Sequence, residues 1–317
     1  MKKRNRPVFF SSTVLIRRLL LILVNLAGVN HGLYAQITLS YTDLVNTDTL
    51  IWRGIDYFPD SITGPGNPGF NAWDFSDLLN RNSDTVYFLN PDLTPFYSKF
   101  PNANLCMVTN EGYTYFNKSA PQFSLEGTAT DILLNGTLIP IKVTPPLSIV
   151  KFPANYMDVY EDSSMINEVI DAKLVGTTSF DYILLTGNVK SYVKWDAYGT
   201  MTTPFGTMNV LRQTVTETIH YTVTGKKFFL GLLLYSTLLS EDVETELRYH
   251  WWTDTPYVGY PVVEMQINSL GTVKSVKFAA ALSVYVKEPI MTFCHDSCDA
   301  AASVNGADSN YQYLWYD

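Results

Sequence analysis

The chain has 317 residues, of which 46% are hydrophobic and only 16% are charged, and it contains three cysteines. Its formal charge is −8 at pH 7. Without the first 35 residues, which hold six basic and no acidic side chains, 16 basic residues stand against 30 acidic ones and the charge is −14. A surface this acidic repels phosphate, which argues against a nucleic-acid partner and against an anionic membrane surface.

Residues 1–35 have the three-part organisation of a secretory signal peptide. Basic residues from Lys2 to Arg18 precede an apolar run from Leu19 to Val29, and a small residue, Ala35, ends the segment. The run has about 11 residues, whereas a membrane-spanning helix needs roughly 20. We therefore predict cleavage near Ala35, contact with the export machinery, and a mature protein that is secreted or at the cell surface. An uncleaved anchor is the alternative.

Alternating apolar and polar residues predict β-strands along most of the remaining chain. The clearest alternation covers residues 214–224, and similar patterns cover 189–195, 263–267 and 276–286. Such alternation buries one face of a strand and leaves the other in water. Glu217 is unusual because it shares the apolar face of its strand.

Turn and helix signals complete this prediction. Asn135-Gly136, between two apolar runs, is typical of a two-residue hairpin turn, and Gly199 and Gly206 bracket a second tight turn. Helical periodicity is weak, and only residues 163–174 favour a short helix. We expect residues 36–288 to form one mainly β body domain, an antiparallel β-sandwich or a partly open barrel with one or two short helices.

The C-terminal segment, residues 289–317, resembles a known repeat. It combines Cys294-His295-Asp296-Ser297-Cys298, a turn at Gly306 and Tyr311-Gln312-Tyr313-Leu314-Trp315. This is similar to the opening half of the repeat of gliding-motility and cell-surface adhesins of Bacteroidetes, truncated at Asp317. Two cysteines and one histidine are too few for a structural zinc site, which takes four ligands. Cys294 and Cys298 are therefore a possible disulfide, or pair with a cysteine elsewhere.

The body resembles a secreted Bacteroidetes domain that has no agreed activity. The residues that carry this resemblance are 64–66 with 72–76, 196–200 with 203–207, and 249–252 with 259–262. Proteins of this kind usually end in a sorting domain for the type IX secretion system. The resemblance implies export and a β architecture, and it implies no particular chemistry.

A cluster of aromatic residues near position 250 is the candidate ligand site. Sugar-binding platforms combine exposed aromatic faces with polar groups, and this segment offers both. Trp251 and Trp252 are consecutive in a predicted strand and must face opposite ways, so one can be exposed while the other is buried. The alternative is that both only pack in the core. The candidate residues are Tyr249, His250, Trp251, Trp252 and Asp254.

Catalytic and metal-binding signals are weak. The sequence has no G-x-S-x-G, H-E-x-x-H or P-loop motif, and 30 acidic residues produce carboxylate pairs by chance. We expect no enzyme activity, no cofactor and no catalytic metal. A structural calcium ion held by loop carboxylates such as Asp158, Glu161 and Asp162 is the alternative to a protein without metal.

Three functions fit these observations. The first is a non-catalytic secreted or cell-surface protein for adhesion or recognition, with a surface glycan or another surface protein as partner. The second is a lipid- or hydrophobe-binding β half-barrel carrier, in which the apolar run 228–239 lines or covers a dry cavity. The third is a secreted glycan-active enzyme, which needs two carboxylates in a cleft, one with a raised pKa.

Overall fold

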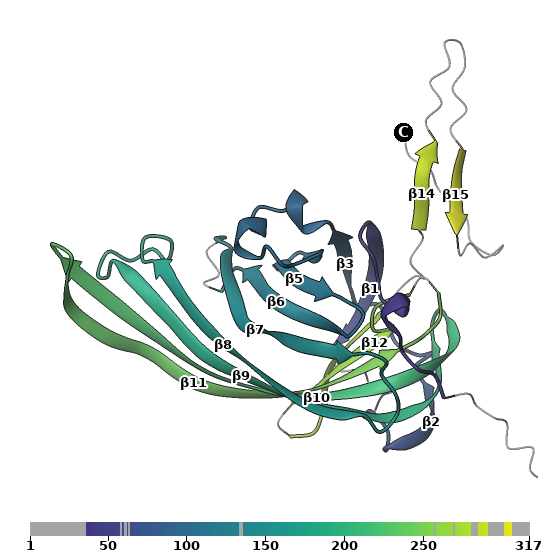
Figure 1. The fold of residues 1–317 in the computed structure, drawn as a ribbon. Coiled ribbons are helices and arrows are strands. Elements are labelled where there is room, and N and C mark those ends of the chain that lie inside the picture. Colours follow the sequence, from purple (N-terminus) through teal and green to yellow (C-terminus); the bar gives the residue numbers. More distant parts are fainter. Residues whose placement is uncertain are drawn as a thin grey trace, which may run out of the picture. The chain divides into compact units, whose positions relative to one another are not determined.

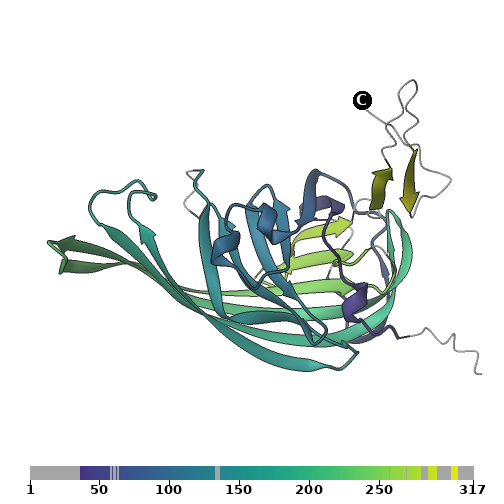
Figure 2. The same cartoon turned by 45° about the horizontal axis from the view of Figure 1, so that its top comes forward.

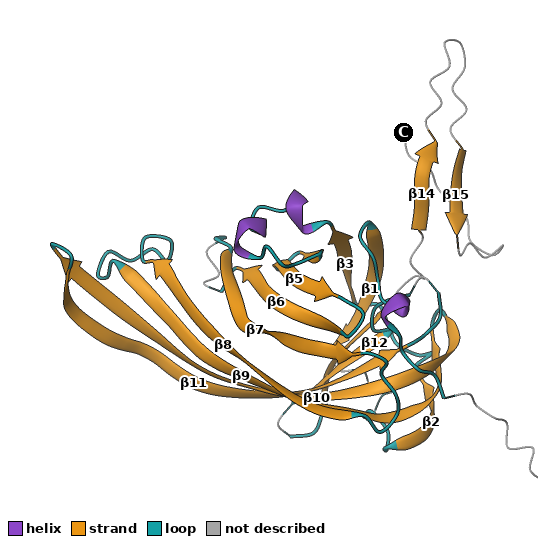
Figure 3. Ribbon diagram, viewed as in Figure 1, coloured by secondary structure: helices purple, strands orange, loops and turns teal. Residues whose placement is uncertain are grey.

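The computed structural model describes residues 36–57, 59, 62, 64–132, 136–256, 258–268, 270–279, 285–290 and 301–305. This part of the chain is almost entirely β, which confirms the predicted class (Figure 3). The predicted signal peptide, its cleavage site at Ala35, Cys294 and Cys298 lie outside the described residues. Among those residues, no helix is both long and apolar enough to cross a membrane.

The strands and single-turn helices have the following bounds. The strands are β1 (Thr49–Tyr57), β2 (Gly69–Asp74), β3 (Asn82–Leu89), β4 (Leu105–Thr109), β5 (Gly112–Lys118), β6 (Gln122–Thr130), β7 (Ile139–Lys151), β8 (Val159–Asp171), β9 (Tyr182–Thr203), β10 (Gly206–Phe229), β11 (Leu232–Trp252), β12 (Val263–Ile267), β13 (Val273–Ala279), β14 (Tyr285–Ile290) and β15 (Ala301–Asn305). The 3-10 turns are η1 (Tyr41–Asp43), η2 (Pro91–Leu93) and η3 (Tyr97–Lys99).

Twelve of these strands close into a barrel (Figure 1). Their order is β10-β11-β12-β13-β1-β3-β4-β5-β6-β7-β8-β9, and β9 pairs with β10 to complete the ring. Every ring pair is antiparallel. The predicted sandwich is therefore wrong, and the partly open barrel was the nearer description. Strand alternation is the same in both architectures, so the sequence pattern did not distinguish them.

The helix expected at residues 163–174 is instead part of a strand. β8 runs to Asp171 and pairs with β9 from Val159 to Asp171. The buried face of this strand includes the polar residues Ser164 and Glu168, so the sequence does not alternate between apolar and polar residues. Both have partners: Ser164 donates to the Pro145 carbonyl at 2.6 Å, and Glu168 accepts from Lys99 at 2.7 Å. The long ladder with β9 outweighs the weak helical spacing.

Most predicted strands and turns are present with shifted ends. Residues 214–224 lie in β10, 189–195 in β9 and 263–267 in β12. The expected strand 276–286 is described only to Ala279 and again from Tyr285. The hairpin expected at Asn135-Gly136 falls between β6 and β7, whose last paired residues are Thr130 and Ile139, and Asn135 itself lies outside the described residues.

The strands β9, β10 and β11 are much longer than the others. They have 22, 24 and 21 residues, and their far ends extend beyond the shorter strands of the ring (Figures 1 and 2). β12 pairs with β11 only between Leu247 and Trp251. The β10–β11 ladder continues from there to the pair Phe229 and Leu232. We call residues 224–239 at its end the distal hairpin.

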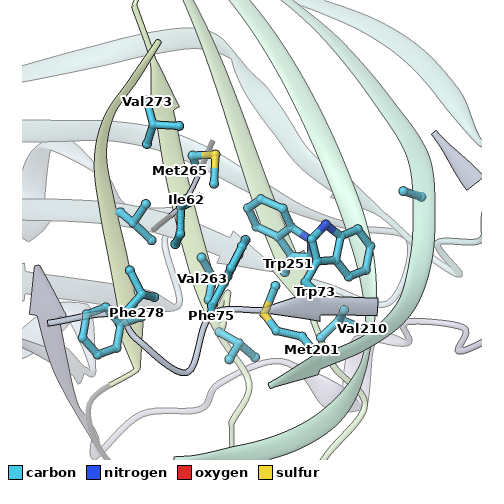
Figure 4. Packing of buried hydrophobic residues seen from close by; sticks show 14 of the residues in the cluster. Ile62, Trp73, Phe75, Met201, Val210, Trp251, Val263, Met265, Val273 and Phe278 are labelled. Carbon is cyan, nitrogen blue, oxygen red and sulfur yellow. The ribbon is translucent and has the colours of Figure 1, made fainter. Parts of the chain in front are cut away.

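Two hydrophobic clusters lie on opposite sides of the barrel wall. The inner cluster includes Trp195 and Trp252, and the outer cluster includes Trp251. The segment before β3 covers the outer cluster: Trp73 on β2 packs edge-on against Trp251 at 5.8 Å between ring centroids (Figure 4). β2 reaches this position by pairing in parallel with β9.

Glycine at position 199 is required by the close approach of β2. Gly199 has φ +148°, and a Cβ there would overlap the main-chain oxygen of Asn71. Gly206 has φ +134° but no neighbour within 4 Å of such a Cβ. We expect Gly199→Ala to lower the free energy of unfolding by about 3 kcal/mol and Gly206→Ala by only about 1 kcal/mol. Denaturant titration of both variants measures this, and equal losses would mean that β2 packing does not need the glycine.

Candidate functional site

The barrel encloses a cavity of about 520 Å³. Every ring strand except β8 contributes lining residues. A cavity of this volume is in the range of sites that bind small molecules. Because residues on alternate positions of each strand point inward, the chemistry of the cavity follows from which face of each strand is turned to the interior.

One wall of the cavity is mainly apolar, although polar side chains such as Thr114, Thr128 and Ser148 also line it. It is formed by β4 to β7 together with β9 and β10. Phe116 and Phe123 pack against each other within it, with ring centroids 4.7 Å apart and ring planes inclined by 32°. Its apolar side chains are Met107, Phe116, Phe123, Leu125, Leu147, Ile149, Val193 and Val215.

The facing wall is polar, because β12 and β13 turn their apolar faces outward. Val263, Met265 and Phe278 pack in the outer cluster, so the residues between them face the barrel interior. We call this the polar wall. Its members are Arg53, Asp84, Glu217, Arg248, His250, Glu264, Gln266, Ser275 and Lys277.

A buried ion-pair network centred on Arg53 anchors the polar wall. Arg53 is 5% exposed and contacts Asp84 on β3 at 2.7 Å and Glu264 on β12 at 3.1 Å. Burial raises the pKa of Glu264, but the combined charges around it, with that of Arg53 the largest, hold that pKa below its usual value. Arg53 Nε has no hydrogen-bond partner among the described residues.

His250 is held in one tautomer by Gln213. The Gln213 Nε2 donates to the Ile149 carbonyl at 2.6 Å, so its Oε1 is the atom that accepts from Trp252 Nε1 at 3.1 Å. The same Oε1 lies 3.1 Å from His250 Nδ1, which must therefore be the donor. Burial lowers the pKa of His250 to about 4, so the ring is neutral at pH 7 with its Nε2 as an acceptor.

Glu217, unusual in the sequence, lines the cavity on β10. Burial raises its pKa; Arg248 opposes that shift and Glu246, directly across on β11, reinforces it. Arg248 forms a close ion pair with Glu246, which also accepts from Gln266 at 3.1 Å. Glu217 thus remains a buried carboxyl in a shared charge cluster.

The residues predicted from sequence are split between the two sides of the wall. Trp251 and Trp252 do face opposite ways, as predicted, but both are buried, at 0% and 2% exposure. Trp251 and Tyr249 belong to the outer cluster, while His250 and Trp252 line the cavity. Asp254 is exposed beyond the end of β11. An exposed aromatic platform is therefore not formed by this segment.

The carboxylates considered for calcium have other partners. Asp158 accepts from the Asn155 main-chain N–H at 2.7 Å, and Asp162 accepts from that of Ser148 at 2.7 Å. In the part of the chain that the structure describes, no three His, Cys, Asp or Glu side chains are grouped so that they could hold a metal ion. Calcium bound by Asp158, Glu161 and Asp162 therefore stays a prediction without support from this grouping.

Sequence reasoning missed the charged members of the polar wall. It assigned the polar faces of β12 and β13 to water, whereas Glu264, Gln266 and Lys277 face the cavity. One signal was available: Arg53 lies between Ile51 and Ile55, two residues away on either side, on the buried face of β1. A lone arginine on an apolar face is buried only when it is paired, so this pattern indicates an interior ion pair.

Comparison with known proteins provides structural likenesses but no family. No protein-family model and no curated protein matches the chain. A solved structure from Bacteroides fragilis, described as a candidate exported protein with a YmcC-like fold, aligns at 11% identity and a TM-score of 0.27, over 77% of this chain and 97% of that one. A candidate lipoprotein from Parabacteroides distasonis aligns at 11% identity and a TM-score of 0.26, over 76% and 97%. Scores this low carry no inference on function.

His250 makes stability depend on pH. The unfolded chain takes up a proton near pH 6.5, whereas the folded protein keeps this ring neutral until about pH 4. Between these values the unfolded state binds more protons, so stability falls as the pH falls. We expect a loss on the order of 3 kcal/mol from this residue over that window.

His250→Gln removes this contribution and should flatten the pH dependence of the unfolding free energy between pH 6.5 and 4. The matched control is His220→Gln, which changes an exposed histidine on β10. Denaturant melts at several pH values measure both. An unchanged slope in His250→Gln would show that His250 is not held neutral by burial.

Proposed function

We propose that this protein is a secreted or cell-surface binding protein that holds a small amphipathic ligand inside its barrel. The observation that carries the proposal is the cavity of about 520 Å³ with one apolar and one charged wall. A fully apolar ligand would leave the polar groups of the charged wall without hydrogen-bond partners. A fully polar ligand would leave the apolar wall in contact with water or polar groups. A molecule with an apolar tail and a polar head matches both.

The polar wall favours an anionic head group. Arg53 and Arg248 have carboxylates within ion-pair distance. Lys277 lies across the ladder from Glu264, whose pKa its charge lowers, but it forms no ion pair among the described residues. Lys277 and the unpartnered Arg53 Nε supply positive charge and an N–H donor, which suit a carboxylate or phosphate. A fatty-acid-like ligand, with its tail against Phe116 and Phe123, is the chemical class that this arrangement supports best.

This proposal favours the carrier hypothesis over adhesion and catalysis. Adhesion through Trp251 or Trp252 is not supported because both are buried. Catalysis by paired carboxylates would use Glu217 and Glu246, but Arg248 and Gln266 already occupy Glu246. This pair therefore gives no reason to propose a glycan-active enzyme.

Filling the cavity should abolish ligand binding without unfolding the protein. Val215 is 9% exposed on the apolar wall, so Val215→Phe places a larger ring in the cavity. We expect the wild type to bind a fluorescent fatty acid saturably at one site per chain, and Val215→Phe to weaken the affinity at least roughly tenfold. Fluorescence titration measures this.

The matched control is Val169→Phe, which changes an exposed valine on β8, the one ring strand that does not line the cavity. It should bind as the wild type does. If Val215→Phe binds equally well, or if the wild type does not bind at all, the interior is not the ligand site.

Surface recognition is a second candidate because aromatic side chains are exposed elsewhere. Trp52 on β1 is 53% exposed and Tyr87 on β3 is 36% exposed. Trp52 is paired with Thr85, which places Tyr87 diagonally across the ladder on the same outer face. Two neighbouring exposed rings are the kind of surface on which sugars stack.

If this face binds a glycan, a glycan-array screen should give saturable binding that Trp52→Ala reduces at least roughly tenfold, with Trp52→Phe retaining part of it. Because Trp52 faces solvent, neither change should lower the melting temperature appreciably. Binding that survives Trp52→Ala, or no binding by the wild type, would remove this candidate.

A further inference from the structure

The distal hairpin exposes a run of large apolar side chains. In the carrier hypothesis, the apolar run 228–239 lines or covers a dry cavity, but most of its residues are in solvent. The exposed fractions at its end are Phe229 66%, Leu230 87%, Leu232 75%, Leu233 54% and Leu234 65%. Consecutive residues of a strand point to opposite faces, so both faces of the hairpin are apolar here. Soluble proteins rarely leave such a cluster uncovered.

The turn of the distal hairpin contains Leu230, whose backbone conformation and exposure to water are both unfavourable for leucine. Phe229 pairs with Leu232, so Leu230 and Gly231 are the two central residues of the turn. Their φ values are +51° and +81°, as in a type I′ turn, where asparagine followed by glycine is preferred. Leucine is strained in this conformation and is 87% exposed. Local structure therefore gives no reason for an apolar side chain at position 230.

A ring of tyrosine and lysine follows directly behind this apolar end. Lys227 is paired with Tyr235, and Lys226 is paired with Ser236 on β11 and Tyr182 on β9. Tyr182 and Tyr235 are 46% and 42% exposed. Tyrosine and lysine are the side chains that position a protein at a membrane surface, because each combines an apolar body with a polar end.

We propose that the end of the distal hairpin inserts into the outer part of one leaflet of a lipid bilayer. The apolar end of the hairpin enters the bilayer with Phe229, Leu230 and Leu232. The lipid head groups lie at the level of Tyr182, Tyr235, Lys226 and Lys227. The four residue steps from Gly231 to Tyr235 span about 13 Å, less than half of the roughly 30 Å hydrocarbon core. The insertion is therefore interfacial, and the unpaired edge of β11 remains hydrated.

A second copy of the chain explains the exposed residues less well. Strand pairing along the free edge of β11 would cover Leu232, Leu233 and Leu234, but it would leave the turn residue Leu230 in water. A bilayer covers the turn first. The net negative charge of the chain repels anionic lipids, so a zwitterionic surface is the expected partner. Lys226 lies beside its phosphates, whereas Lys227 is paired with Asp181 at 2.8 Å.

Flotation with phosphatidylcholine vesicles tests this proposal on the intact protein. We expect the wild type to float with the vesicles at both low and high salt, because the contact is mainly apolar. Leu230→Asn removes the apolar side chain and installs the preferred turn residue, so it should not lower the melting temperature. It should reduce the partition coefficient by roughly tenfold.

Leu270→Asn is the matched control. Leu270 is also 87% exposed and also precedes a glycine with positive φ, in the turn between β12 and β13. It should float like the wild type. The proposal is overturned if the wild type stays in the soluble fraction, if Leu230→Asn floats as well as the wild type, or if the protein is a dimer that Leu230→Asn dissociates without any vesicle binding.

Discussion

The pairing of β10 with both β9 and β11 is the interaction on which the rest of the structure depends. Near Gly206 this ladder closes the barrel, because β9 and β10 join the two ends of the strand order. Farther along it supplies Val215 and Glu217 to the cavity. At its far end it carries Leu230, beyond the reach of the shorter strands. One continuous set of backbone hydrogen bonds therefore positions the interior site and the distal hairpin together.

The second constraint is that two strands turn their apolar faces out of the barrel. β12 and β13 can do so because the segment carrying Trp73 covers them, forming the outer cluster. This leaves Glu264 and Lys277 facing inward, where Arg53 compensates part of the charge. Here the ion pairs keep one wall polar and give the cavity its amphipathic character.

Much of the fold followed from the sequence, and the limits have physical causes. The strand around Thr218 and the turn before Gly206 were predicted because alternation and turn chemistry are local. Ring closure was not predicted because it depends on pairing between distant strands. The helix at 163–174 was wrong because Ser164 and Glu168 are buried polar residues whose partners come from elsewhere in the chain.

The candidate site was predicted only in part, for a similar reason. The segment around His250 was singled out, and the opposite orientation of its two tryptophans was right. The side of the barrel wall on which the cavity lies, however, depends on the segment carrying Trp73, which covers the outer side. Local alternation of apolar and polar residues does not reveal this. Leu230 was not singled out because an apolar run is interpreted as core unless the turn geometry is known. The positive φ of Leu230 and its exposure become visible only in three dimensions.

The most direct test of the interior site is a crystal structure of the protein grown with a medium-chain fatty acid. The account predicts one extended tail between Phe116, Phe123 and Val215, with the carboxylate beside Lys277 and Arg53. Electron density for ordered water alone in the cavity, with the fatty acid absent or bound outside the barrel, would contradict it.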